Sequence, residues 1–210
     1  MRTRVFIIAV AVLFCAVNAF AGETALTSDG YGHMYPKWSL DGNWIVYSRG
    51  DSTGYEQIYK ISASGGPEIA LTSDSFGHGY PSWSPDGNWI VYLKRDATTY
   101  AQVYKVPSGG GSEVQLTSSV TWVGDMKQYP EWSPDGNWIV FTNVDATEYR
   151  QIYKVSSTIG PEQALTTDLY NHGGQWGQHF TPDSQFIYYS KLDSSGYTHI
   201  YKVPVGGGQK

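Results

Sequence analysis

The stretch WSPDGNWIVY, residues 83–92, decides the fold because the chain repeats it. The same phrase recurs at residues 132–141 with only its last letter changed, and at residues 38–47 as WSLDGNWIVY. A weaker copy, FTPDSQFIYY, spans residues 180–189. The four starting positions lie 45, 49 and 48 residues apart. Self-similarity at such a period predicts a repeat architecture.

Two further motifs accompany each copy in a constant order. A segment of the type QIYKV follows the phrase and begins at Gln57, Gln102, Gln151 and His199. A segment of the type ALTSD links the units and begins at Ala25, Ala70, Gln115 and Ala164. Three motifs in one order, four times over, are not a chance similarity.

Each unit is predicted to form four short strands. In the second strand of one unit, Trp89, Val91 and Leu93 fall on one face, and Ile90 and Tyr92 fall on the other. A Pro-Asp-Gly turn precedes this strand, and a glycine-rich turn follows the third. Because both faces are apolar, each sheet needs a neighbouring sheet on either side. Four strands in about 45 residues are typical of a β-propeller blade.

The first 21 residues have the three features of a secretory signal peptide. Two arginines near the start precede an apolar run, and the small-x-small sequence Ala19-Phe20-Ala21 follows it. We therefore expect cleavage after Ala21, which leaves residues 22–210 as a single propeller domain. A periplasmic or extracellular location follows from this prediction.

Cysteine usage limits the chemistry. Cys15 is the only cysteine, so residues 22–210 can form neither a disulfide nor a thiolate metal site. A lipoprotein signal ending at Cys15 is the alternative to the cleaved peptide. It is disfavoured because Phe14 stands where a small residue is required.

Composition excludes two classes of partner. The 210 residues carry a net charge of −5 without any basic block, which argues against nucleic acid. No apolar run follows the signal segment, which argues against stable membrane insertion. Aromatic residues at 15%, with 24 glycines and 10 prolines, suit many short strands and turns.

The pattern YPxWSPDGxxIVY, followed by QIYKV, a glycine turn and LT, resembles the TolB-like β-propeller repeat. This resemblance covers nearly all of residues 22–210 and implies an all-β, WD-repeat-like propeller. In TolB proteins, which act in the cell envelope, an N-terminal α/β domain precedes a propeller of six blades. This chain has four repeats and no such domain, so the resemblance implies an interaction module without fixing its partner.

The linking motifs predict how the ring closes. Residues 22–29 have fourth-strand sequence, and residues 199–210 have the sequence of a third strand with its glycine turn. We expect the N-terminal strand to complete the last blade, which removes two free sheet edges. A four-bladed monomer is the favoured form. Two chains that each lend this strand to the other, forming a larger ring, are the alternative.

The repeated polar residues are predicted to be architectural. The Asp of each SPDG turn should accept local hydrogen bonds, and the tryptophans should pack between blades. Histidines in the linkers could instead hold a divalent cation, with His33, His78, His172 and His179 as candidates. Their recurrence favours a structural role, because a functional site usually breaks the symmetry of a repeat.

The symmetry breaks in the linkers that precede the third and fourth blades. These linkers supply the candidate ligand-binding residues, which are Trp122, Asp125, Tyr170, His172, Trp176, Gln178 and His179.

The predicted function is a secreted, non-enzymatic module that binds a protein, peptide or glycan across the channel-mouth face. No cofactor is expected, although a divalent cation is left open, and no catalytic motif for hydrolysis or nucleotide binding is present. The alternative is a metal-dependent polysaccharide lyase or hydrolase. It rests on Gln178, His179 and His172, which resemble the metal-binding pattern of oligogalacturonate lyases.

Overall fold

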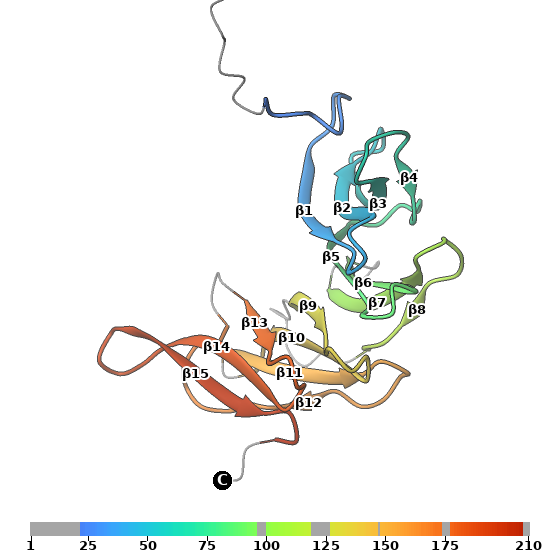
Figure 1. The fold of residues 1–210 in the computed structure, drawn as a ribbon. Coiled ribbons are helices and arrows are strands. Elements are labelled where there is room, and N and C mark those ends of the chain that lie inside the picture. The colour runs from blue at the N-terminus through green and yellow to red at the C-terminus, as the bar shows by residue number, and fades with distance from the viewer. Residues whose placement is uncertain (1–21, 96–99, 119–126, 147, 174–176, 208–210) are drawn as a thin grey trace, which may run out of the picture.

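The computed structural model describes residues 22–95, 100–118, 127–146, 148–173 and 177–207. All regular elements in these ranges are β-strands, and they form four antiparallel sheets. The sheets follow one another along a curve, with β1 (His33–Trp38) at one end and β15 (Thr198–Pro204) at the other (Figure 1). Within these ranges no helix is long and apolar enough to span a membrane.

The first two blades have four strands each, in sequence order. After β1, the first blade consists of β2 (Trp44–Gly50), β3 (Glu56–Ser62) and β4 (Ile69–Ala70). The second blade consists of β5 (His78–Trp83), β6 (Trp89–Arg95), β7 (Ala101–Pro107) and β8 (Val114–Gln115).

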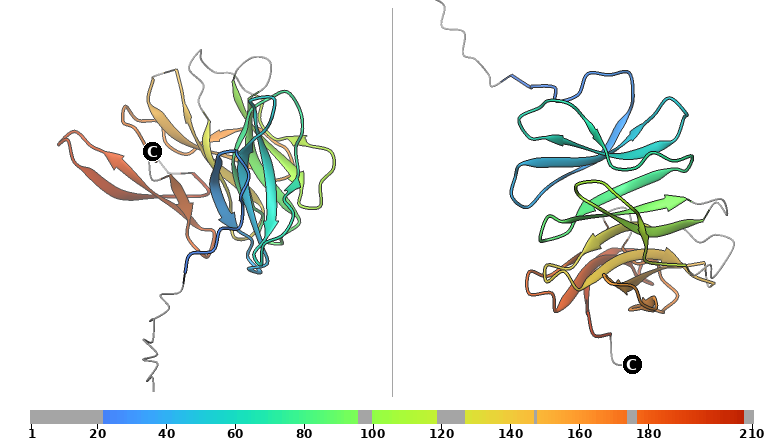
Figure 2. Two further views of the ribbon diagram at one scale, coloured as in Figure 1. Left: turned by 90° about the horizontal axis from the view of Figure 1, so that it is seen from above. Right: turned by 90° about the vertical axis from the view of Figure 1, so that its right-hand side faces the viewer.

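The third blade repeats this arrangement, and the fourth shows three strands. The third consists of β9 (Gln128–Trp132), β10 (Trp138–Val144), β11 (Arg150–Ser156) and β12 (Gln163–Ala164). The fourth consists of β13 (Gln178–Phe180), β14 (Phe186–Leu192) and β15. The successive sheets are seen edge-on in the right-hand view of Figure 2.

The turn between the first two strands of each blade is fastened by its Ser and Asp. In the second blade, the Ser84 hydroxyl donates to Asp86 (2.5 Å), whose carboxylate accepts from the backbone N–H of Asn88 (3.0 Å). Gly87 supplies the positive φ of 72° that the turn requires. The other blades repeat these bonds, with Thr181 and Asp183 in the fourth. The structural interpretation of this aspartate is therefore confirmed.

Both faces of β6, a central strand of an inner blade, are covered by neighbouring blades. On β6, Ile90 and Tyr92 belong to the apolar cluster that joins the second blade to the first. Val91 and Leu93 belong to the cluster that joins the second blade to the third. All four are at most 5% exposed, so the predicted two-sided burial is confirmed.

A lysine in the third strand fastens each blade to the next. Lys60 Nζ donates to the carbonyl of Ser108 in the second blade (2.6 Å) and lies 4.4 Å from the ring of Trp44. Lys105 and Lys154 make the same pair of contacts one and two blades further on. Burial lowers the pKa of all three ammonium groups.

The ring is open in this structure, which differs from the predicted closure. Residues 22–32 contain no strand and do not pair with β15. Instead Leu26 packs on the first blade with Ile45, Tyr47 and Ile61. The three packed interfaces between blades set a curvature that holds the first and last blades apart (Figure 1).

The open ring also changes the environment of one predicted packing residue. Trp132 is buried and Trp83 is half-buried, as expected for side chains between blades. Trp38, at the same position in the first blade, is 61% exposed. No preceding blade covers it within the described residues, so the packing interpretation is wrong for this copy.

Replacing Lys105 with Met should destabilise the fold by about 1–2 kcal/mol. The substitution keeps the apolar stem and removes the ammonium group that bonds to Ser157 (2.7 Å) and lies 4.2 Å from the ring of Trp89. Urea unfolding followed by circular dichroism measures the change. The matched control is Lys37→Met at an exposed lysine, and equal effects of the two changes would contradict the fastening role.

Candidate functional site

The first strands of all four blades line one groove on the concave side of the curve. Its volume is about 620 Å³. Figure 1 shows β1, β5, β9 and β13 along this inner side. Its lining includes Tyr35, Tyr80, Tyr129, Glu131, Gln178 and His179.

Three tyrosines of the groove have a backbone conformation that L-residues rarely adopt. Tyr35, Tyr80 and Tyr129 have φ of 55°, 55° and 54°. Each lies at a bulge, where the register between the first and second strands shifts. Such a conformation costs about 1–3 kcal/mol and persists only where the surroundings enforce it. The three tyrosines therefore mark a functional candidate.

The tyrosine rings contact one another along the groove. Tyr35 and Tyr80 stack with ring centroids 4.1 Å apart, and the Tyr35 hydroxyl donates to that of Tyr80 (3.2 Å). Tyr129 meets the Tyr80 ring edge-on at 5.1 Å. Burial, followed by the hydrogen bond from Tyr35, raises the pKa of Tyr80, so its hydroxyl stays protonated at neutral pH.

The fourth blade supplies a different group of residues. Gly177 takes the position of the tyrosines, three residues before the end of the first strand, and has the same sign of φ (72°). Beyond it, His179 Nδ1 lies 2.7 Å from Glu131 Oε2, and its ring lies against Tyr188. The buried Gln178 amide donates to the Tyr129 carbonyl (2.6 Å). One end of the groove thus carries an imidazole and a carboxylate, paired beside the aromatic row.

The structure brings only some of the predicted ligand-binding residues together. Gln178 and His179 lie in the groove. His172 is 1% exposed and lies outside the groove, bonded to Asp168. Tyr170 also lies outside it, beneath the ammonium of Lys191. The remaining predicted residues, which are Trp122, Asp125 and Trp176, fall outside the described residues.

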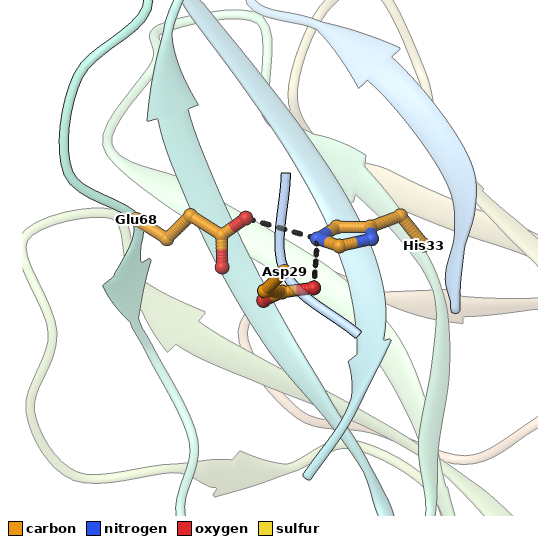
Figure 3. Close-up of side chains that lie close together, drawn as sticks. All are labelled: Asp29, His33 and Glu68. Carbon is orange, nitrogen blue, oxygen red and sulfur yellow. Dashed lines mark hydrogen bonds and ion pairs between the residues drawn. The ribbon is translucent and has the colours of Figure 1, made fainter. Parts of the chain in front are cut away.

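Three of the four candidate metal-binding histidines, His33, His78 and His172, occupy ion-pair clusters inside the blades. In the first blade, His33 Nε2 lies 2.9 Å from Glu68 Oε1 and 3.7 Å from Asp29 Oδ1 (Figure 3). Arg49 completes the cluster, since its guanidinium pairs with both carboxylates.

The second blade has the same cluster with lysine as the cation. Lys94 Nζ pairs with Asp74 and lies 2.5 Å from Glu113 Oε2, while His78 Nε2 lies 3.3 Å from Glu113 Oε1. Burial of Glu113 opposes its ionisation. The hydrogen bonds from His78 and Lys94 outweigh that effect and lower its pKa to about 2.

The later blades vary this cluster. The third blade has Lys127 at the histidine position, with Nζ 3.9 Å from Glu162 Oε2, and an uncharged Asn143 at the cation position. In the fourth, Asp168 lies 2.6 Å from His172 Nε2 and 2.5 Å from Lys191 Nζ. Burial lowers the pKa of His172.

The groups Asp29–His33–Glu68 and Asp74–His78–Glu113 have the donor atoms and spacing that a metal ion requires. In both, however, a guanidinium or ammonium already pairs with the two carboxylates. His179 lies in the groove, away from these clusters, and the structure therefore gathers the four predicted histidines into no single site.

The groove tyrosines are the residues that sequence reasoning missed. Their signal was the Tyr-Pro pair that recurs three times and becomes Gly-Gln in the fourth unit. A glycine in place of tyrosine indicates a position that needs positive φ. Without that comparison the pair reads as ordinary strand sequence.

The succession of four antiparallel sheets resembles the fold of TolB-like β-propellers. No protein-family model and no curated protein sequence match the chain. A solved structure described as TolB of Agrobacterium tumefaciens superposes with a TM-score of 0.68 and 23% identity, covering 82% of this chain and 61% of that one. TolB of Acinetobacter baumannii gives 0.63 and 19%, with 91% and 48% covered.

An enzyme is also among the similar structures. Oligogalacturonate lyase in complex with manganese superposes with a TM-score of 0.63 and 18% identity, covering 86% of this chain and 50% of the lyase. The chain spans less than two thirds of the length of each of these three proteins. At such identities the likeness establishes the fold alone.

Replacing Glu113 with Gln should change how stability depends on pH. A carboxylate whose pKa falls from 4.5 to about 2 on folding stabilises the protein above pH 4.5, and this contribution is lost as pH falls toward 2. The variant should be less stable at pH 7, and its deficit should shrink between pH 4.5 and 2. Thermal unfolding across that window measures it, with Glu148→Gln at an exposed glutamate as control. A deficit independent of pH would contradict the assignment.

Proposed function

We propose that this chain is a non-enzymatic β-propeller module, periplasmic or extracellular, that binds an extended protein segment along the groove. The observation that carries the proposal is the row of three tyrosines held at positive φ. A backbone strained at three equivalent positions on one concave surface suits a surface organised for recognition. The TolB-like structural neighbours agree with a binding module.

The geometry of the tyrosines favours peptide over glycan. Sugars bind proteins by stacking on open aromatic faces, but Tyr35 covers one face of Tyr80 and Tyr129 meets its ring edge-on. The hydroxyls, together with the pair formed by Glu131 and His179, offer donors and acceptors to a peptide backbone. A glycan therefore remains the second candidate ligand.

Replacing Tyr80 with Gly should weaken peptide binding without unfolding the protein. Glycine removes the central ring of the row and tolerates the positive φ, as Gly177 does in the fourth blade. The expected loss is about tenfold or more in affinity. Peptides selected from a displayed random library, and separately an oligosaccharide array, are the probes. Affinity by calorimetry and unfolding temperature are both measured.

The matched control is Tyr197→Ala, because Tyr197 is 71% exposed and lies outside the groove. Selected peptides that bind the wild type and Tyr197→Ala equally, but not Tyr80→Gly, support the proposal. The peptide assignment would be overturned if the selected peptides bound Tyr80→Gly as tightly as the wild type. Binding of oligosaccharides but of no peptide would also overturn it.

We further propose that no divalent cation is needed for folding or binding. Arg49 and Lys94 hold the positions that a cation would take among the carboxylates, and a second positive charge beside them is unfavourable. The lyase alternative rests on other residues, and it is disfavoured because His172 is buried on Asp168, outside the groove that holds Gln178 and His179.

Chelator and added Mn²⁺ should therefore leave the unfolding temperature unchanged within error. Differential scanning calorimetry with EDTA or with millimolar Mn²⁺ measures this. A metal-dependent shift that His33→Gln or His78→Gln removes would show that the clusters are cation sites.

A further inference from the structure

The two ends of the curve present surfaces that each lack a partner. On the fourth blade, Tyr188 and Ile200 are 43% and 84% exposed. Their counterparts in the first blade, Val46 and Ile58, are fully buried against the second blade. At the far end of the curve the opposite kind of face is covered by no blade. Leu26 packs there on Ile45 and Tyr47, and Trp38 of β1 is 61% exposed.

Leu26 occupies half of a position that recurs inside the chain. Leu71 of the LT motif lies between two blades, since it clusters with Val46 of the first blade and with Ile90 of the second. Leu26 belongs to the same motif but contacts only the first blade, through Ile45 and its neighbours. The blade that should precede it is missing from the described structure.

The open edge of β15 fits the threonine of the same motif. In the first blade, Thr72 Oγ1 accepts from the N–H of Ile58 (2.9 Å) and donates to Gln57 Oε1 (2.9 Å). The second and third blades repeat both bonds. In the fourth blade the corresponding edge, at His199 and Ile200, is exposed and no fourth strand pairs with it among the described residues. Thr27 is the threonine that follows Leu26.

The charge cluster of the fourth blade lacks the same segment. Glu68 and Glu113, three residues before the leucine of each LT motif, complete the clusters of the first two blades. The cluster of Asp168, His172 and Lys191 shows no such glutamate among the described residues. Glu23 stands three residues before Leu26 and is exposed.

The inter-blade lysine gives a fourth match. Lys60, Lys105 and Lys154 each donate to the carbonyl at one repeated position of the next blade. Lys202 lies over the Phe186 ring in the same way, 4.5 Å away, and has no next blade in the described structure. The corresponding carbonyl of the first blade is that of Ala63.

We propose that the fourth blade of one copy binds the first blade of a second copy, and that two such contacts close a two-chain ring. Residues 23–27 of each chain then add a fourth strand to β15 of the other. Leu26 covers Ile200, and Glu23 joins the cluster of Lys191. A head-to-tail contact of this kind forms a closed ring when the rotation that relates the copies adds up to a full turn. The resulting eight blades lie within the range that propellers adopt.

The observed placement of the N-terminal segment favours a second copy over closure of one chain on itself. Leu26 already packs on the first blade. The first blade lies at the opposite end of the curve from β15 (Figure 1). Closing one chain would require its four sheets to rotate at three interfaces whose side chains are fully packed. A second copy needs no such change.

A cysteine exchange experiment separates the two arrangements. The register of the first blade, Lys60 opposite Ile69, places Thr24 opposite Lys202, close enough for a disulfide. Thr24→Cys and Lys202→Cys are made separately in a Cys15→Ser background, so that no other thiol is present. The two proteins are mixed and oxidised. A covalent dimer that joins position 24 to position 202, found by peptide mapping, is expected.

A double variant that carries both cysteines in one chain tests closure of the chain on itself. If oxidation of the double variant yields only covalently closed monomers, and the mixture yields no dimer, the proposal is overturned. Absence of any disulfide in both cases overturns it as well.

The oligomeric state of an Ile200→Arg variant is the second test. Ile200 is 84% exposed in the single chain, so arginine should leave the monomer folded, yet it places a charge inside the proposed contact. Sedimentation velocity should show a dimer for the wild type and association weakened roughly tenfold or more for the variant. Ile159→Arg, at a 63% exposed isoleucine outside the contact, is the control and should remain dimeric. A monomeric wild type at high micromolar concentration would overturn the proposal.

Discussion

The packing of one blade on the next depends on sheets that are apolar on both faces. Ile90, Val91 and Tyr92 are consecutive residues of one strand, and all are fully buried because different neighbours cover the two sides. Burying one such side chain contributes about 1.5–3 kcal/mol, and an isolated blade would lose that contribution on both faces. A blade therefore gains much of its stability from the blades beside it. The same requirement makes the outer faces of the first and fourth blades the least satisfied parts of the molecule.

Polar contacts between and within blades then fix how the sheets meet. The lysine of the third strand reaches one carbonyl of the next blade, so it sets the separation and angle that apolar packing alone leaves adjustable. Inside a blade, the charged cluster joins the first, second and fourth strands. In the third blade the positive charge comes from a different strand. Asn143 of the second strand replaces the usual cation, and Lys127, just before the first strand, replaces the histidine and pairs with Glu162. This exchange is the behaviour of a structural ion pair.

The sequence was sufficient for the repeat, the turn chemistry and the two-sided burial, because each depends on local spacing. It was insufficient for the histidines, whose partners Glu68 and Arg49 come from other strands and are identified only by register. It also could not reveal the strained tyrosines, since φ depends on the bulge that the neighbouring strand imposes. Broken symmetry pointed toward Gln178 and His179, which do lie in the groove, but the rest of that groove is built from symmetric positions.

The groove and the open ends are connected by geometry. The first strands of all four blades face one concave surface, so a ring made of two copies would face eight first strands toward one axis. Each groove would then form half of a shared channel. A peptide lying in that channel would contact both copies, and it would stabilise the assembly by the same free energy by which assembly strengthens its binding. Peptide affinity measured at protein concentrations above and below the dimerisation constant should therefore differ, whereas a groove used by single chains would give one value throughout.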